Sequence, residues 1–354
     1  MNLDVFFRDA VDLLKRLISI PSISREENQL ADFLEIMLKE KKYHPQRKGN
    51  NIWLASSGWN DQKPAILLNS HIDTVKPVAG WTKEPFFPLE KDGKLYGLGS
   101  NDAGASLVSL LQTFMILSQT QQENNFIFLA SGEEEISGKN GIESVLPELP
   151  PIDLGVVGEP TSMQPAIAEK GLMVLDGIVR GKSGHAAREE GENAIYKAIP
   201  VIEWFQNHRF PAVSPLLGPV KMTVTGIEAG TQHNVIPDLC KFTVDVRTNE
   251  LYANETLFDA IAAGCGAEVQ ARSFRLNSSR IAPDHPFVQR AIALGMTPFG
   301  SPTLSDQSLM YFPSVKIGPG NSARSHTADE FIFLAEIDDA ITRYIALLSN
   351  LKLS

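Results

Sequence analysis

Histidine and acidic residues follow three apolar segments of the chain, at the point where each segment ends. They stand in the sequences His71-Ile72-Asp73, Gly132-Glu133-Glu134-Glu135 and Gly158-Glu159-Pro160. Side chains of an extended strand repeat with a period of two, so His71 and Asp73 point to the same side. An imidazole oriented by a neighbouring carboxylate is a common metal ligand. Because so many carboxylates in one cleft would repel one another, the pattern predicts a divalent metal site.

Each of these motifs is weak when taken alone. A single His-x-Asp is more often structural, and a run of glutamates is more often a solvated surface. Their position after apolar segments favours a functional interpretation, because open α/β sheets place their sites beyond the carboxyl ends of strands. Asp102 precedes a helical pattern and is expected at the same edge, whereas Glu135 is expected at a helix start or in solvent. The segment 97–102 lacks the third glycine of a dinucleotide-binding loop.

The first and last parts of the chain show the pattern of an α/β domain. Apolar residues recur at helical spacing in the segments 7–18, 30–38 and 107–115. Short apolar runs, expected to be buried strands, cover residues 65–68, 126–130, 154–157 and 315–317. Glycines bound these runs and helical patterns separate them, which predicts a largely parallel sheet flanked by helices.

The middle of the chain predicts a second, smaller domain. Strands are expected at 172–180, 221–225, 241–247 and 268–274, with helices at 193–205, interrupted by Pro200, and at 256–263. This order is β-α-β-β-α-β, the split βαβ arrangement. We therefore predict a domain of residues 166–279 inserted into a larger one formed by residues 1–165 and 280–354.

Composition excludes several classes of protein. The 354 residues are 43% hydrophobic and 21% charged, which is ordinary for a soluble globular protein. The net charge of -10 leaves no basic excess to neutralise nucleic-acid phosphates. No apolar stretch is long enough to span a membrane, and the start of the chain shows no secretion signal. The two cysteines, Cys240 and Cys265, lie in apolar segments and are expected to be core residues of a cytoplasmic protein.

The acidic and histidine motifs together resemble one family of dinuclear metallohydrolases. The matching positions are His71, Asp73, Asp102, Glu133, Glu134, Glu159 and the segment 325–330. They resemble the aminoacylase and acetylornithine deacetylase family, which also contains succinyl-diaminopimelate desuccinylase and several peptidases. The resemblance runs through nearly the whole chain and implies a zinc-peptidase-like catalytic domain with an inserted ferredoxin-like lid or dimerisation domain.

The resemblance also assigns roles around the metal site. It implies that His71 and Glu159 bind one metal ion, that Glu134 and His326 bind the other, and that Asp102 bridges the two. Glu133 is then the general base, and Asp73 supports His71. Two divalent ions are expected, with zinc preferred and cobalt or manganese as alternatives. The family further implies a cis peptide bond between Asp102 and Ala103.

The remaining roles concern the substrate. By resemblance, His185 stabilises the developing oxyanion across the interface of a homodimer formed through the 166–279 domain. Asn234 and Arg247 hold the substrate, with Arg247 gripping its carboxylate. Gly318 and Gly320 belong to a loop that lines the pocket. One departure is clear: family members commonly carry Arg-Gly and Asp-Met-Lys-Gly around the bridging aspartate, whereas this chain has Gly97-Leu98-Gly99-Ser100-Asn101-Asp102-Ala103-Gly104.

The implied activity is hydrolysis of the amide bond of an N-acyl amino acid. The chain is most similar in pattern to acetylornithine deacetylase, which implies N-acetylornithine deacetylation in arginine biosynthesis first, with the succinylornithine or acylcitrulline equivalent second. Three alternatives remain open. They are succinyl-diaminopimelate desuccinylase, a di- or carboxypeptidase of the same fold, and a non-catalytic metal- or ligand-binding homologue.

Overall fold

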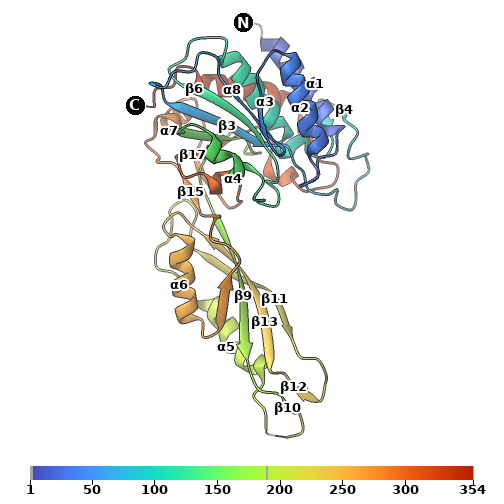
Figure 1. Ribbon diagram of the computed structural model, residues 1–354, viewed down its shortest axis with the longest axis vertical. Coiled ribbons are helices and arrows are strands. Elements are labelled where there is room, and N and C mark those ends of the chain that lie inside the picture. The colour runs from blue at the N-terminus through green and yellow to red at the C-terminus, as the bar shows by residue number, and fades with distance from the viewer. Residues whose placement is uncertain (1–2, 189, 354) are drawn as a thin grey trace. The chain divides into compact units, whose positions relative to one another are not determined.

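The computed structural model describes residues 3–188 and 190–353, and the chain divides into two compact units (Figure 1). The first unit comprises residues 1–167, 280–299 and 305–354, and the second comprises residues 168–279 and 300–304. The second unit begins two residues after the predicted start of the inserted domain. It also takes in the short segment 300–304, which we expected in the larger domain.

A mixed sheet forms the centre of the first unit. Its strand order is β1-β2-β6-β3-β7-β17-β8-β15. The chain leaves the first unit within β8 and returns to it within β15. The bounds are β1 Gln46–Lys48, β2 Asn51–Ala55, β3 Ala65–His71, β6 Asn125–Ser131, β7 Leu154–Val157, β17 Ser314–Lys316, β8 Ala166–Glu169 and β15 Ser279–Arg280. The central pairs β6–β3, β3–β7 and β7–β17 are parallel, whereas β1–β2, β2–β6 and β17–β8 are antiparallel. The predicted α/β fold is therefore confirmed, with its parallel part at the centre.

Both faces of this central sheet are covered. Every residue of β3, β6 and β7 is buried, which explains why these strands are continuous apolar runs rather than alternating ones. One face packs in a core with the helices α1 Leu3–Ile18, α2 Asn28–Glu40, α3 Ala105–Leu117, α7 Pro286–Ala293 and α8 Leu334–Leu348 (Figure 1). The other face packs against the short helix α4 Ile142–Val145. The layers hold the carboxyl ends of the parallel strands at one edge.

A three-stranded sheet completes the first unit. It runs β18-β5-β4, with bounds Phe331–Phe333, Lys94–Tyr96 and Leu89–Lys91. No helix among the described residues is long and apolar enough to cross a membrane.

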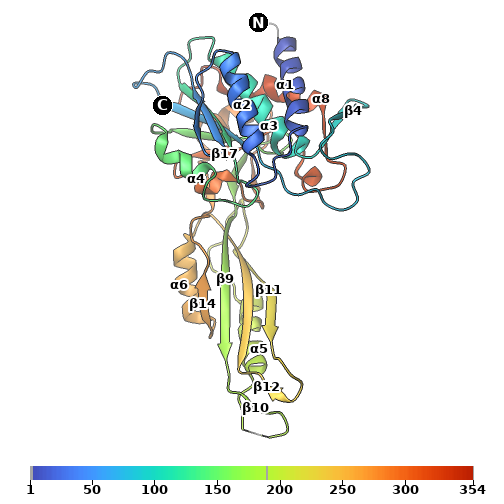
Figure 2. The ribbon, with the colours of Figure 1, turned by 45° about the vertical axis from the view of Figure 1, so that its right-hand side comes forward.

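The second unit has the predicted β-α-β-β-α-β order. Its elements are β9 Gly171–Arg180, α5 Ala194–Asn207, β11 Lys221–Ala229, β13 Leu239–Thr248, α6 Asn254–Gly264 and β14 Glu268–Ala271. The strands form an antiparallel sheet in the order β11-β13-β9-β14, and Figure 2 shows β14 beside β9, with β11 at the opposite edge of this sheet. Alternate residues of β9 and β13 are buried, as expected of a sheet with helices on one face.

Helix α5 corrects one detail of the prediction. We expected Pro200 to interrupt this helix, but α5 continues from Ala194 to Asn207 with Pro200 inside it. Pro200 is exposed, as is Tyr196 one turn earlier, so the carbonyl that loses its hydrogen-bond donor can bind water instead.

Candidate metal centre

Three neighbouring strands of the first unit carry histidine and acidic residues at their carboxyl ends. His71 is the last residue of β3, Glu134 and Glu135 follow β6, and Glu159 follows β7. Because β6, β3 and β7 are adjacent and parallel, their carboxyl ends bring these side chains to one edge of the sheet. Asp102 lies in the short turn Ser100–Gly104 before α3, and His326 lies in the loop before β18. The Asp102–Ala103 peptide bond is cis, which confirms that prediction.

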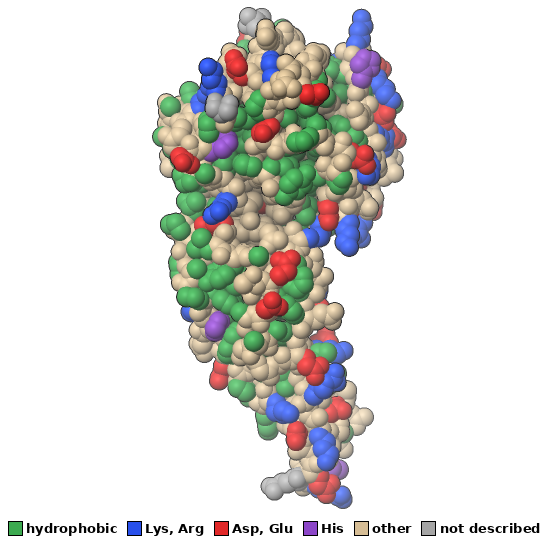
Figure 3. Space-filling model, turned by 60° about the vertical axis from the view of Figure 1, so that its left-hand side comes forward, with side chains coloured by type: hydrophobic (Ala, Val, Ile, Leu, Met, Phe, Trp, Pro, Cys, Tyr) green, Lys and Arg blue, Asp and Glu red, His purple; other side chains and the backbone are tan. Residues whose placement is uncertain are grey.

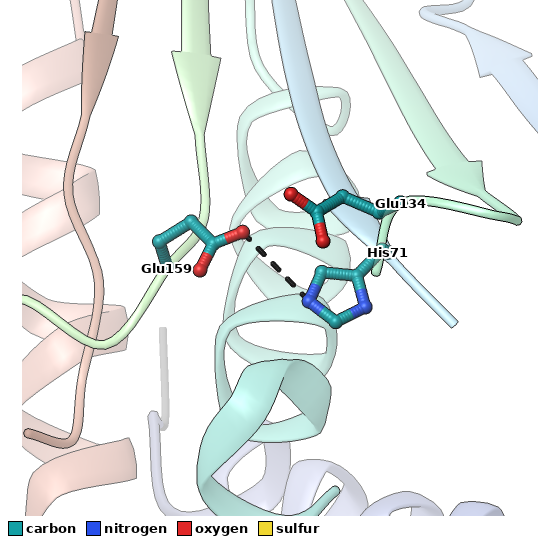
Figure 4. Close-up of side chains that lie close together, drawn as sticks. All are labelled: His71, Glu134 and Glu159. Carbon is teal, nitrogen blue, oxygen red and sulfur yellow. Dashed lines mark ion pairs between the residues drawn. The ribbon is translucent and has the colours of Figure 1, made fainter. Parts of the chain in front are cut away.

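The side chains of this edge form two overlapping groups. His71, Glu134 and Glu159 offer ligand atoms that all lie within 4.8 Å of one another, and so do His71, Asp102 and Glu135. Figure 4 shows the carboxylates of Glu134 and Glu159 turned toward the His71 imidazole. His71 Nε2 lies 3.7 Å from Glu159 Oε1. The two groups share His71.

Asp102 stands between two histidines. Its Oδ1 lies 3.3 Å from His71 Nε2, and its Oδ2 lies 3.6 Å from His326 Nε2. Each carboxylate oxygen therefore faces a different imidazole, as in a carboxylate that bridges two ions. His326 Nε2 also lies 2.9 Å from Glu135 Oε2.

The electrostatics of the cluster favour a cation. Burial and the neighbouring Asp102 raise the pKa of Glu159 to about 8. Burial and the proximity of Glu159 raise the pKa of Glu134 well above its usual value. A hydrogen bond to Glu135 raises the pKa of His326 to about 9. Protons thus relieve the repulsion in the ligand-free protein, and imidazole and carboxylate groups are donors that suit zinc. The residues therefore fit a divalent metal site.

The tautomer of His71 also fits this use. Its Nδ1 lies 2.8 Å from the backbone oxygen of Asp73, so Nδ1 carries the proton. Nε2, which faces Asp102 and Glu159, is then free to bind a cation.

Glu133 lies outside the cluster, although we predicted it as the base. Its carboxylate accepts hydrogen bonds from the side-chain amide of Asn140 at 3.0 Å and from the backbone N–H of Asn140 at 3.3 Å. It belongs to neither ligand group. The cause is local, because Glu133 has a φ of 55° and this left-handed residue ends the alternation of β6.

Glu135 enters the cluster instead of solvent. Only 7% of its side chain is exposed, so the expectation of a solvated carboxylate was wrong. The two glutamates that face the histidines are therefore 134 and 135, one residue later than the predicted pair.

The Asp73 carboxylate anchors this pair. It accepts the backbone N–H of Glu134 at 2.9 Å, the backbone N–H of Glu135 at 3.1 Å, and the hydroxyl of Ser24 at 2.7 Å. Its Oδ1 is 3.6 Å from His71 Nδ1, so its contact with the histidine is the looser one. Asp73 thus holds the backbone of Glu134 and Glu135 in place, and it also lies beside His71.

Two buried carboxylates near the centre had no predicted role. Glu330 accepts the backbone N–H groups of Gly99, Asn101 and Asp102 at 3.0, 2.8 and 2.9 Å. Burial and the nearby Asp102 raise its pKa to about 8. Asp306 accepts the hydroxyl of Ser131 at 2.6 Å, and burial raises its pKa to about 6. Only the position of Glu330 in the segment 325–330 could have pointed to it.

The predicted glycine loop follows β17 and is tightly packed. The backbone oxygen of Gly318 accepts the N–H of Met163 at 2.8 Å, and that of Gly320 accepts the N–H of Ser162 at 2.6 Å. A Cβ on Gly318 would overlap Ser106 and Glu159, and Gly320 has a φ of 84°. Packing accounts for both glycines, and their contact with a substrate stays a prediction.

The predicted substrate residues of the second unit fall into two places. His185 lies in β10 (Gly184–His185), which pairs with β12 (Val235–Ile236), and both His185 and Asn234 are exposed. Arg247 lies at the far end of β13, where it binds Asp245 through two hydrogen bonds of 2.9 and 3.0 Å. The chain enters β13 beside β12 at Leu239, eight residues earlier, which corresponds to about 26 Å of strand. One copy of this unit does not bring His185 and Arg247 together.

Known proteins match the chain over most of its length. The model of peptidase family M20/M25/M40 matches residues 67–350. A succinyl-diaminopimelate desuccinylase of Wolbachia pipientis subsp. Culex pipiens (strain wPip) is 25% identical over 289 residues, which cover 77% of this chain and 73% of the relative. An acetylornithine deacetylase of Proteus mirabilis (strain HI4320) is 27% identical over 362 residues, 93% of each chain. Among solved structures, the Bacillus subtilis YXEP protein, a dinuclear metal binding peptidase from the M20 family, has a TM-score of 0.73 at 21% identity and 99% coverage of both chains.

Proposed function

Since the chain belongs to the peptidase family M20/M25/M40, whose members are metallohydrolases, we propose that it removes the acyl group from an N-acyl amino acid. N-acetylornithine is the first substrate to test, followed by the succinylornithine and acylcitrulline equivalents of arginine biosynthesis. The observation that carries the proposal is the placement of Asp102, whose two oxygens face His71 and His326 separately.

The proposed metal site uses two histidines and three carboxylates. His71 and Glu159 would hold one divalent ion, Glu135 and His326 would hold the other, and Asp102 would contact both. The distances of 2.9 to 3.7 Å among these ligand atoms support this set. When bound, such ions polarise a carbonyl and lower the pKa of a water molecule. Zinc suits these donors, with cobalt or manganese as alternatives.

We propose Glu134, rather than Glu133, as the general base. Among the described residues, no hydrogen-bond or ion-pair partner occupies its carboxylate, which lies beside His71 and Glu159. Burial disfavours its charged form and raises its pKa, which increases its affinity for a proton. Glu134 would take a proton from the attacking water and deliver it to the leaving amine.

The substrate would be recognised by residues of the second unit. Arg247 would bind the α-carboxylate, and its guanidinium already binds a carboxylate, that of Asp245, through two hydrogen bonds. His185 and Asn234 would act from the second subunit of a homodimer formed through residues 166–279. Their separation from Arg247 along the sheet supports this arrangement, because one subunit would then supply one end of the site and its partner the other.

The charge of the protein surface agrees with a small-molecule substrate. Acidic and basic side chains are interspersed on the face drawn in Figure 3, and the net charge is -10, so a small amino-acid derivative is a better ligand than nucleic acid.

A second candidate substrate has a specific basis. The Wolbachia pipientis relative named succinyl-diaminopimelate desuccinylase matches at 25% identity, close to the 27% of the acetylornithine deacetylase. Desuccinylation of a diamino acid uses the same chemistry with a longer, charged acyl group. A peptidase would need room for a second amino acid, and a non-catalytic homologue would lack the base or a ligand.

A substrate panel tests the proposal. The zinc-loaded protein is assayed with N-acetylornithine, N-succinylornithine, N-acetylcitrulline, N-succinyl-diaminopimelate and dipeptides, with release of free amine as the signal. The highest kcat/KM is expected for an acylated ornithine or citrulline. Faster cleavage of dipeptides would contradict the proposal, and the Glu134→Gln variant serves as the control for contaminating hydrolases.

A further inference from the structure

Asn101 stands directly before Asp102, and its side chain connects the Asp102 segment to the loop that follows β17. Asn101 is completely buried. Its Nδ2 donates to the backbone oxygen of Asn321 at 3.1 Å, and its Oδ1 accepts the backbone N–H of Asn321 at 3.0 Å. The side-chain amide therefore pairs with both backbone groups of one residue, as a neighbouring strand would.

Asn321 follows the glycine loop 318–320 directly. Nδ2 of Asn101 also lies 3.3 Å from Ser325 Oγ, next to His326. Gly320 packs directly on Asn101, because a Cβ at that position would overlap the side-chain oxygen. A single buried side chain thus connects the Asp102 segment to both ends of the segment 320–325.

The backbone of the same segment is held independently. Glu330 accepts the N–H groups of Gly99, Asn101 and Asp102, so Asp102 keeps its place without help from the Asn101 side chain. The amide of Asn101 consequently has a separate effect, which is to position the glycine loop relative to the metal ligands.

We infer that Asn101 is a positioning residue that sets the place of the 318–321 loop and thereby the affinity for substrate. The inference rests on the proposed function in assuming that this loop contacts the substrate. Replacing Asn101 by a small residue without an amide, such as alanine, is unfavourable, because the backbone N–H and C=O of Asn321 would lose their hydrogen-bond partners. The class of ligand affected is the N-acyl amino acid whose acyl part meets the loop.

Asn101→Ala tests the inference in two ways. The first measurement is amide hydrogen exchange of the metal-loaded protein, in which the Asn321 N–H is expected to exchange at least about tenfold faster than in the wild type. This measurement needs no substrate, so it decides the contact even if the proposed activity is wrong. Unchanged exchange at Asn321 would overturn the inference.

The second measurement separates binding from chemistry. With the best substrate of the panel, KM is expected to rise about tenfold while kcat changes less than about threefold, because ground-state and transition-state binding are lost together. Zinc affinity, measured by calorimetric titration, should stay within about threefold of wild type because Glu330 still holds Asp102. A fall in kcat with unchanged KM, or a large loss of zinc, would contradict the assignment.

Asn124→Ala is the matched control. Asn124 is also buried and donates to a backbone oxygen of the C-terminal segment, that of Leu351, at 2.6 Å. It lies outside the metal centre, so its replacement should lower the melting temperature without changing KM. If Asn124→Ala raised KM equally, the effect of Asn101 would be general destabilisation and the inference would fail.

Discussion

The metal centre of the first unit and the predicted substrate residues of the second unit are built in opposite ways. His71 is buried and surrounded by Asp73, Asp102 and Glu159, each within 4 Å. His185 is exposed, and its ring makes only one hydrogen bond among the described residues, accepting the backbone N–H of Ala187 at 3.1 Å. A site that must hold cations in fixed geometry needs a rigid, satisfied environment, whereas residues that meet a substrate or a partner must stay accessible. The contrast predicts which substitutions remove the metal-dependent chemistry of a subunit and which remove the contribution of its partner to the site.

The largest effect is expected at Glu134. Glu134→Gln removes the proposed base and should lower kcat by about 10²–10⁴-fold while both metal ions stay bound. Glu133→Gln is the matched neighbour: it weakens the contacts with Asn140 and should cost about 1 kcal/mol of stability with little effect on kcat. Activity and metal content of the two variants decide the assignment. A large loss of kcat in Glu133→Gln alone would restore the original prediction.

Subunit mixing tests whether His185 of the second unit acts in the active site of the partner subunit. His185→Ala and Glu134→Ala should each be nearly inactive, but their coexpression should return about a quarter of wild-type activity. The reason is that random assembly makes about half of the dimers mixed, and each mixed dimer has one intact composite site.

The mixing experiment needs proof that subunits exchange, for which two different affinity tags suffice. Mixed dimers without activity would show that His185 works in its own subunit or has no role in catalysis.

Glu330 offers a test within the metal centre. Glu330→Ala removes the acceptor of three backbone N–H groups around Asp102 and should weaken metal binding by about 10–100-fold. Glu336→Ala is the control, because Glu336 lies in the same C-terminal region but pairs with Arg324. Equal metal affinity in the two variants would show that Glu330 does not support the metal site.

A smaller effect is expected from pH in the metal-free protein. The pKa of Glu159 and that of Glu330 are raised from 4.5 to about 8, so the folded chain binds more protons than the unfolded chain between these values. The pKa of His326 is raised from 6.5 to about 9, so this histidine also binds more protons in the folded chain than in the unfolded chain. The free energy of unfolding should therefore fall as pH rises from about 5 to 9.

Calorimetry with and without a chelator checks this dependence. In the metal-loaded protein the free energy of unfolding should fall less steeply with pH, because the cation rather than protons neutralises the carboxylates. A chelated protein that became more stable over this range would contradict the raised pKa values.

Much of this molecule follows from the amino-acid sequence alone. The apolar runs before His71, before the glutamates and before Glu159 are strands, and all three end at one edge of the sheet. This was predictable because burial on both faces gives a continuous apolar strand, and because parallel strands carry their sites at the carboxyl end. The alternating pattern of the second unit likewise predicted its sheet.

Only the tertiary structure decided which of three consecutive glutamates faces the histidines. The left-handed turn at Glu133 rotates its carboxylate toward Asn140, and the Asp73 carboxylate then fixes Glu134 and Glu135 through their backbone N–H groups. Glu330 and Asn101 escaped prediction for the same reason, since both act on backbone groups of residues more than two hundred positions away. A sequence pattern displays side-chain types and spacing, but the direction of a turn and the partner of a backbone amide depend on segments that meet only in the folded chain.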